Sequence, residues 1–383
     1  MELKKITFTE NEGTLQEWSL DSLLLGSRNL IVGRNTSGKS RTLSVIASLA
    51  RNLANLQPPG MSAKYTCFLE HEDKKYIYEL NYYNQQVISE KLVIDDIIRL
   101  KRGEGGVGEI FAEGIDGGTN IKFQAPIVEL AAVVRRDTVQ HSFLEPLYEW
   151  ASSLRYYQFG TTLGKDQIVI LNQGSPKVDE RNQQAVVGIF RDGITEFPNT
   201  FHDAILRDMA DIEYHIEKID ISTPVSIRVA GLPGEPLGLS VKEKDLPGIT
   251  DQFSMSQGMF RVLSLIIHVN YIQFKKSASC ILIDDIGEGL DFDRSCRLIE
   301  LLRSKAGEFE LQIIMTTNDR FVMNKVPLEE WSVLQRTGNS VKVVNYSNSR
   351  KIFDDFKYTG LSNFSFFELD IPNDVIRQED SNE

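Results

Sequence analysis

Residues 33–40 have the side-chain types and the spacing that bind phosphate groups. They read Gly-Arg-Asn-Thr-Ser-Gly-Lys-Ser and match the pattern G-x-x-x-x-G-K-[ST] at every required position. The glycines let backbone N–H groups turn toward a phosphate, Lys39 reaches its oxygens, and the Ser40 hydroxyl binds Mg²⁺. This stretch predicts a site for a nucleoside triphosphate and Mg²⁺. The contacts that we expect are Gly33, Arg34, Asn35, Thr36, Ser37, Gly38, Lys39, Ser40 and Arg41.

Two adjacent carboxylates end an apolar run at residues 280–285, which read Cys-Ile-Leu-Ile-Asp-Asp. Open α/β sheets place ligands beyond the carboxyl ends of their strands. Asp284 could there hold Mg²⁺ beside the β- and γ-phosphates, and Asp285 could orient or deprotonate the attacking water. The alternative is a strand end with two solvated acids. The phosphate-binding pattern upstream favours the first interpretation, more strongly for Asp284 than for Asp285.

Ser256, Gln257 and Gly258 stand where a helix is expected to begin. A hydroxyl, a small residue and free N–H groups at the positive end of a helix dipole can bind an anion. The alternative is an ordinary helix cap, which these three residues taken alone would favour.

The elements that must position these residues alternate between strands and helices. Apolar runs at 2–8, 15–24 and 29–32 predict strands, and apolar residues spaced by three and four after Ser40 predict a helix. Alternating residues between 65 and 94 predict an antiparallel meander, and the glycine-rich stretch 103–118 predicts a surface loop.

The second half of the chain continues this alternation. Buried strands that alternate with helices predict a parallel sheet covered by helices. The expected elements are helices within 127–154 and 180–216, strands at 156–159 and 219–229, a hairpin region at 231–248, a buried helix at 258–274, and strands at 280–285 and 311–319.

The composition describes an ordinary globular chain. Its 383 residues are 41% hydrophobic and 25% charged, with a net charge of −12. Apolar runs stay below the ~18–20 residues of a membrane span, and the first residues lack a signal peptide, so we expect a cytoplasmic protein without a membrane partner. The acidic balance argues against nucleic acid coating the whole surface but leaves room for a local basic groove.

Four stretches together resemble the ABC-type ATPases, specifically the soluble SMC/RecF/OLD-like group of bacterial ATPases. In that group a phosphate loop, a signature motif, a Walker B strand with its D-loop and a switch strand occur in this order. The matching stretches are residues 33–40, 255–261, 281–291 and 313–318. The resemblance implies a P-loop NTPase of the α/β class: a two-lobed head with a mixed central sheet, an antiparallel meander, a helical lobe and no coiled-coil arm.

The resemblance also implies a division of the chain. A lobe with the phosphate loop would comprise about 1–125 and 275–350, and a helical signature lobe about 126–274 would be inserted into it. An aromatic tail would follow at 351–383, packed against the head or docking a partner. ATP and Mg²⁺ would lie between two copies, with Ser256, Gln257 and Gly258 of one copy facing the ATP of the other.

This chain departs from the family pattern at two positions. Family members usually have glutamate where Asp285 stands, and many have histidine where this chain has Asn318. Glu288 could serve as the base instead, and the Q-loop glutamine could be Gln124 or Gln140. The resemblance therefore implies ATP binding with slow hydrolysis, in which Asp285, Glu288 and Asn318 are the candidate catalytic residues.

The function that these features predict is a nucleotide-gated switch. It would dimerise or form a higher homo-oligomer around ATP and control a separately encoded effector such as a nuclease, in phage defence or DNA repair. Three alternatives stay open: a repair clamp that binds DNA directly, a non-hydrolysing ATP-bound scaffold and, with less support, the ATP-binding subunit of a transporter.

Overall fold

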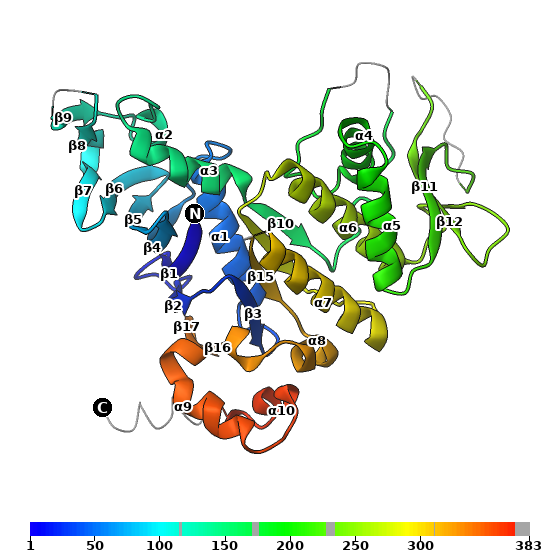
Figure 1. The fold of residues 1–383 in the computed structure, drawn as a ribbon. Coiled ribbons are helices and arrows are strands. Elements are labelled where there is room, and N and C mark those ends of the chain that lie inside the picture. Colours follow the sequence, from blue (N-terminus) through cyan, green and yellow to red (C-terminus); the bar gives the residue numbers. More distant parts are fainter. Residues whose placement is uncertain (115–116, 171–175, 227–233, 310, 372–383) are drawn as a thin grey trace.

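A mixed β-sheet of 14 strands runs through the molecule (Figure 1). The computed structural model describes residues 1–114, 117–170, 176–226, 234–309 and 311–371. The strand order is β10-β14-β15-β3-β16-β17-β2-β1-β4-β5-β6-β7-β8-β9. The strands are β1 (Glu2–Glu10), β2 (Trp18–Leu24), β3 (Arg28–Gly33), β4 (Ser62–His71), β5 (Lys74–Tyr83), β6 (Gln86–Ile94), β7 (Ile97–Arg102), β8 (Val107–Ala112), β9 (Thr119–Gln124), β10 (Arg155–Gln158), β14 (Cys280–Asp284), β15 (Gln312–Thr316), β16 (Trp331–Thr337) and β17 (Ser340–Asn345).

Helices cover this sheet, and a second, three-stranded sheet stands beside helices α4 and α5 at the far end of the molecule (Figure 1). The strands of the small sheet are β11 (Ile216–Ser222), β12 (Gly238–Glu243) and β13 (Thr250–Asp251). The α-helices are α1 (Lys39–Leu53), α2 (Ala131–Val134), α3 (Glu145–Ser153), α4 (Val186–Glu196), α5 (Thr200–Asp211), α6 (Gln257–Lys275), α7 (Phe292–Glu308), α8 (Arg320–Lys325), α9 (Tyr346–Lys357) and α10 (Asn363–Glu368). Three 3₁₀ turns are η1 (Glu104–Gly106), η2 (Ser142–Leu144) and η3 (Leu328–Glu330).

Five neighbouring strands form the parallel part of the large sheet: β10, β14, β15, β3 and β16. All residues of β14 and β15 are buried, because helices pack on both faces of these strands. Ile31, Leu282 and Ile314 face the core under α1 and α3, while their chain neighbours face the core under α6, α7 and α8. The carboxyl ends of these strands therefore lie at one edge, where the sequence predicts the site.

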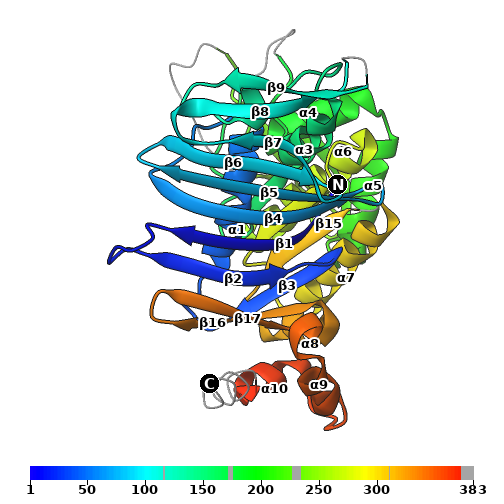
Figure 2. The same cartoon turned by 90° about the vertical axis from the view of Figure 1, so that its left-hand side faces the viewer.

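The antiparallel meander predicted at 65–94 is present and is longer than expected. Strands β4, β5 and β6 continue through β7, β8 and β9, stacked one above the other in Figure 2. The prediction of a surface loop over 103–118 is wrong for residues 107–112, which form β8 between β7 and β9. Ile110 and Ala112 of β8 are buried, and Phe111 between them is only half-buried, as in a strand with one buried face. The glycines around this stretch obscure the pattern in the sequence.

Other predicted elements differ in extent. Within 127–154 only α2 and α3 are α-helical, with the turn η2 between them. The strand predicted at 219–229 begins earlier, at Ile216, and ends at Ser222, while Ile227 and Val229 lie outside the described residues. In the described part of the chain, no helix combines the length and the apolar character needed to cross a membrane.

Residues 130–158 contribute more to the sheet than to the helical part of the molecule. Trp150 and Leu147 of α3 pack in the same core as Leu43 and Ile46 of α1, and β10 forms an edge of the large sheet. These residues thus pack with the large sheet, and the division of the chain into two lobes near residue 126 stays a prediction.

The aromatic tail predicted after residue 350 packs against the rest of the molecule over its described part. Phe353 of α9 and Phe366 of α10 are fully buried, with ring centroids 4.6 Å apart. Both belong to the core that includes Trp331 and Val344. Figure 2 shows α9 and α10 beneath the β16–β17 end of the sheet.

This packing predicts that the tail contributes to the stability of the head. Phe366→Ala should lower the free energy of unfolding by about 3–5 kcal/mol, because it removes a buried ring and leaves a cavity. Urea denaturation would measure the loss. Tyr358→Ala is the matched control, since Tyr358 is 90% exposed in the same segment and should change stability little. Equal effects of the two substitutions would contradict the packing.

Candidate nucleotide-binding site

The phosphate loop, residues 33–40, connects the carboxyl end of β3 to the first turn of α1. Gly38 caps the helix with φ 105°, and a Cβ at this position would lie 3.1 Å from the Trp18 ring. Only glycine meets both conditions without strain. The first N–H groups of α1 have no intrahelical partner, so this end of the helix can bind an anion. The structure thus forms the loop that the sequence pattern predicts.

Lys39 is the buried cation of this loop. Its side chain is 7% exposed, and its Nζ donates a hydrogen bond of 2.8 Å to the Gly33 carbonyl oxygen. Burial lowers the pKa of Lys39, while the carboxylates of Asp285 and Asp284 oppose this effect. The ammonium group therefore lies near both acids and inside the curve of the loop.

Ser40, Asp284 and Thr316 bring three neighbouring elements together at the carboxyl edge of the sheet. The Ser40 hydroxyl donates to Asp284 Oδ1 over 3.0 Å, and Thr316 Oγ1 donates to the same oxygen over 2.5 Å. A hydroxyl and a carboxylate at this separation are the oxygen ligands that Mg²⁺ takes beside a phosphate. Among the described residues no group of three or more His, Cys, Asp or Glu could hold a metal, so these two ligands would need nucleotide oxygens to complete the shell.

Asp285 lies beyond the end of β14 in an unusual backbone conformation. Its φ is 54°, and its N–H donates to Thr316 Oγ1 over 2.9 Å. Left-handed backbone at a residue other than glycine often marks a functional site. Burial raises the pKa of the Asp285 carboxyl, and the negative charges of Asp284 and Glu288 raise it further. A raised pKa makes this carboxylate a better proton acceptor.

A cavity of about 250 Å³ adjoins Asp285 and contains room for a small molecule such as water. Glu288 and Asn318 line it as well, and both are exposed. The Asn318 amide donates to Asp285 Oδ1 over 3.1 Å. The structure therefore brings together the three residues that the sequence proposes as catalytic.

Comparisons with known proteins concern the fold alone. No protein-family model matches the chain, and no curated protein matches it. Among solved structures, an SMC head bound to the C-terminal winged-helix domain of ScpA matches with a TM-score of 0.54 and 12% identity, over 91% of this chain and 100% of that one. The chain has the fold of SMC head domains.

Two further SMC heads are similar. The SMC head domain from Thermotoga maritima aligns at a TM-score of 0.44 and 16% identity, over 90% of this chain and 99% of that one. The Smc head domain with an extended coiled coil, bound to the C-terminal domain of ScpA derived from Pyrococcus furiosus, aligns at 0.49 and 12%, over 93% and 99%.

The signature segment, residues 255–261, begins α6. Ser256 caps the helix, and its hydroxyl accepts a hydrogen bond of 3.2 Å from the Met259 N–H. The capping role weighed from the sequence is thus present, while a hydroxyl that accepts one bond can still donate another. Ser256 is exposed, so its hydroxyl can reach a second molecule. Gly258 packs on the loop 285–291, where a Cβ would lie 3.0 Å from the Gly289 oxygen.

The structure identifies a glutamine that sequence reasoning missed. Gln158 ends β10 and pairs in register with Asp284 of β14. The two glutamines proposed from the sequence lie elsewhere: Gln124 is exposed on the edge strand β9, and Gln140 is exposed in the loop before η2. The proposal of Gln124 or Gln140 for the Q-loop is wrong by position. A polar residue that ends the apolar run Tyr156–Tyr157 was the available signal.

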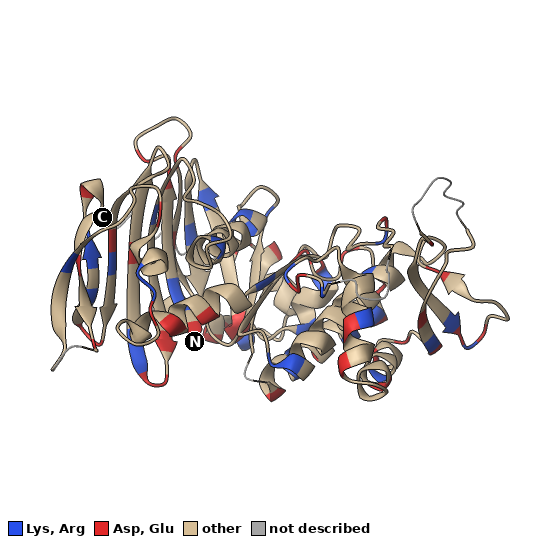
Figure 3. Ribbon diagram, turned by 90° about the horizontal axis from the view of Figure 1, so that it is seen from above, with Lys and Arg blue, Asp and Glu red and all other residues tan. Residues whose placement is uncertain are grey.

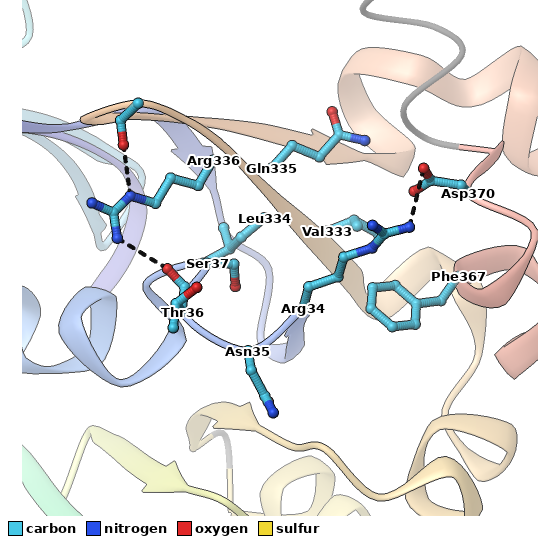
Figure 4. A pocket seen from close by; sticks show the side chains of 11 residues that line it. Arg34, Asn35, Thr36, Ser37, Val333, Leu334, Gln335, Arg336, Phe367 and Asp370 are labelled. Atoms are coloured by element: carbon cyan, nitrogen blue, oxygen red, sulfur yellow. Dashed lines mark hydrogen bonds and ion pairs between the residues drawn. The ribbon is translucent and has the colours of Figure 1, made fainter.

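Residues 34–37 of the phosphate loop also line a second cavity. It has a volume of about 380 Å³ and lies between the loop, the β16–β17 hairpin and the C-terminal segment (Figure 4). Arg34 forms an ion pair of 3.2 Å there with Asp370, and Arg336 Nη1 donates to the Thr36 oxygen over 3.2 Å.

Arg41 contacts side chains of β1 and β2. Its guanidinium stacks over the Trp18 ring with 4.4 Å between them and pairs with Glu10 of β1. Its contact with a nucleotide therefore stays a prediction from the sequence.

Proposed function

We propose that this chain is an ATP-binding head that associates with a second copy around ATP, hydrolyses it slowly and controls a separate effector protein. The observation that carries the proposal is the contact of Ser40 with Asp284 beside Lys39. A hydroxyl, a carboxylate and an ammonium at the end of a phosphate loop match the oxygens and charge of a Mg²⁺–nucleotide complex.

In this proposal, different residues bind the phosphates, bind the metal and activate water. Lys39 and the N–H groups of α1 bind the phosphates. Ser40 and Asp284 would hold Mg²⁺, which would supply positive charge beside the phosphates. Asp285 orients a water molecule in the adjoining cavity and accepts its proton, for which its raised pKa is suited.

Association through the signature segment follows from its exposure and its helix dipole. The first turn of α6 presents Ser256 and free N–H groups to a neighbour, and an ATP held by another copy would supply the anion. The fold of SMC head domains supports this part of the proposal. We include in it the Gln257 and Gly258 contacts expected from the sequence.

Ser256→Arg is therefore expected to leave ATP bound to single heads but to prevent their ATP-dependent association. The arginine side chain would occupy the space of the γ-phosphate of the neighbour's ATP. Light scattering with and without ATP would measure association, and calorimetry would measure binding.

Two variants control this experiment. Ser254→Arg adds the same charge two residues upstream at another exposed position and should still associate. Ser256→Thr keeps both the cap and the hydroxyl and should behave like the wild type. An unchanged ATP-induced rise in the mass of Ser256→Arg would contradict the proposed interface.

The solved SMC head is bound to a domain of ScpA, which supports binding of a protein partner by a head of this fold. A nuclease effector in phage defence or DNA repair is our extension of this idea from the resemblance of the sequence motifs. Positive and negative residues are interspersed along both halves of the described chain in Figure 3, which does not favour direct DNA binding.

A second candidate function is a scaffold that stays bound to ATP without hydrolysing it. The observation that favours it is the hydrogen bond from the Asn318 amide to Asp285. The amide occupies one carboxylate oxygen and cannot relay a proton. It therefore reduces the capacity of Asp285 to orient and deprotonate a water molecule. Turnover measurements on Asp285 variants separate the two functions.

A further inference from the structure

Arg261 of α6 contacts two separate loops at the carboxyl edge of the sheet. Its three guanidinium nitrogens each donate to a different backbone carbonyl oxygen. Nε reaches Thr161 at 2.8 Å, Nη2 reaches Gly160 at 2.6 Å, and Nη1 reaches Glu288 at 3.0 Å. The planar fork of a guanidinium can hold three acceptors in fixed directions, which an ammonium group cannot do.

The first of these loops continues directly from Gln158. Thr161 Oγ1 donates to the Gln158 oxygen over 2.7 Å, and the Phe159 N–H donates to the Asp284 oxygen over 2.9 Å. A displacement of Gly160 and Thr161 would therefore move Gln158 relative to Asp284.

The second loop carries the proposed catalytic acids. Glu288 donates its N–H to the Asp285 oxygen over 3.2 Å, and its carboxylate lies against Gly160, where a Cβ would come within 2.3 Å of Oε2. The Glu288 side chain thus packs directly on the Gly160 backbone. Arg261 Nη1 also lies 3.0 Å from where a Cβ of Gly289 would be.

Arg261 lies five residues after Ser256 in the first turns of the same helix. Gln257 strengthens the connection, since its Nε2 donates to the Thr161 oxygen over 3.4 Å. One rigid helix start thus carries both the residues exposed to a second copy and the side chain that holds the loops around Asp285.

We infer that Arg261 is a positioning residue that couples the signature segment to the loops around Asp285 in the same chain. The inference rests on the proposed function, in which one copy's signature segment contacts the other copy's ATP. Through Arg261, ATP bound at the phosphate loop orients the helix start for the second copy. In the reverse direction, engagement of the helix start by that copy orients Asp285 and Gln158. The two ATP molecules of a dimer are thereby linked.

The test compares Arg261→Met with the wild type and with Arg297→Met. Methionine keeps much of the length of arginine and removes all its donors. Arg297 is an exposed arginine of α7 that pairs with Glu213, so its substitution controls for loss of one positive charge. Arg261→Met should bind ATP with an affinity within about twofold of the wild type, because Arg261 lies outside the phosphate loop. Its maximal turnover and its ATP-dependent association should each fall by about tenfold or more.

Hydrogen exchange supplies a readout that simple loss of stability would not change. It is measured on Ser256→Arg heads, which bind ATP as single molecules under the proposed function. ATP should protect the phosphate loop and also the first turn of α6. In the Ser256→Arg, Arg261→Met double variant, protection of the phosphate loop should stay and protection of α6 should disappear. Arg261→Lys should recover only part of the effect, since lysine cannot reach three carbonyls in fixed directions.

The outcomes separate the inference from the function on which it rests. Failure of wild-type protein to bind ATP would overturn both. ATP binding and association by the wild type, together with unchanged turnover, association and α6 protection in Arg261→Met, would overturn the coupling alone. A parallel fall in ATP affinity and thermal stability would also overturn it, because that pattern belongs to a residue that only holds the fold together.

Discussion

Replacing Lys39 by alanine is expected to lower the affinity for ATP by about 100-fold or more. Its Nζ is buried inside the phosphate loop, where it now donates to the Gly33 carbonyl oxygen. Two charge-assisted hydrogen bonds to phosphate oxygens, each worth about 1.5–3 kcal/mol, account for a loss of this size. Isothermal calorimetry with ATP and Mg²⁺ would measure the change.

Lys64→Ala is the matched control for this substitution. Lys64 is an exposed lysine of β4 that pairs with Glu12, so its loss changes the net charge equally and leaves the loop intact. It should bind ATP like the wild type. A thermal melt of Lys39→Ala should show a folded protein. Wild-type affinity in a folded Lys39→Ala protein would refute the assignment of residues 33–40 as a phosphate loop.

Substitution of Asp285 is expected to lower ATP turnover by about tenfold or more. A positioned acid–base group contributes roughly 10²–10⁴ to a rate, and Asn318 already occupies one carboxylate oxygen. Asp285→Asn is the sharpest variant, because asparagine has the same size and tolerates the left-handed backbone of φ 54°. We expect wild-type turnover itself to lie below the ~1–100 s⁻¹ of kinases. Steady-state phosphate release would measure both rates.

Two further variants identify the base. Asp285→Glu tests whether the short side chain of Asp285 limits ATP turnover, because glutamate is one methylene longer. If the carboxylate of Asp285 stops short of the water, this variant should turn over ATP faster. Glu288→Gln tests the alternative base that lines the same cavity. Fast wild-type turnover that Asp285→Asn leaves unchanged and Glu288→Gln abolishes would transfer the role to Glu288. The absence of measurable turnover in wild-type protein that binds ATP would favour the scaffold.

The spacing of apolar residues predicted many of the strands and helices correctly, because it follows directly from which faces of each element are buried. The apolar residues of β14 and β15 are continuous because both faces of these strands are buried, and the same continuity marked them as strands. Strand β8 was missed because glycines surround it, and a glycine-rich stretch is typical of a loop, although β8 pairs with the strands just before and after it.

The sequence by itself determined the phosphate loop and the two acids that end β14. Their chemistry depends on residue types within a few positions of one another, and a strand end followed by a helix suffices to orient them. It also placed Ser256 at the start of α6, since capping is a local property of the chain.

Only the tertiary structure decided which glutamine joins the site and what holds the loops around it. Gln158 lies beside Asp284 because β10 pairs with a strand more than 120 positions later in the chain. The bonds from Arg261 to Gly160 and Thr161 cross about 100 positions and end on backbone carbonyls, which every residue type possesses. An acceptor common to all residues leaves no trace in a sequence. Such contacts become visible only when the sheet has brought the strand ends together.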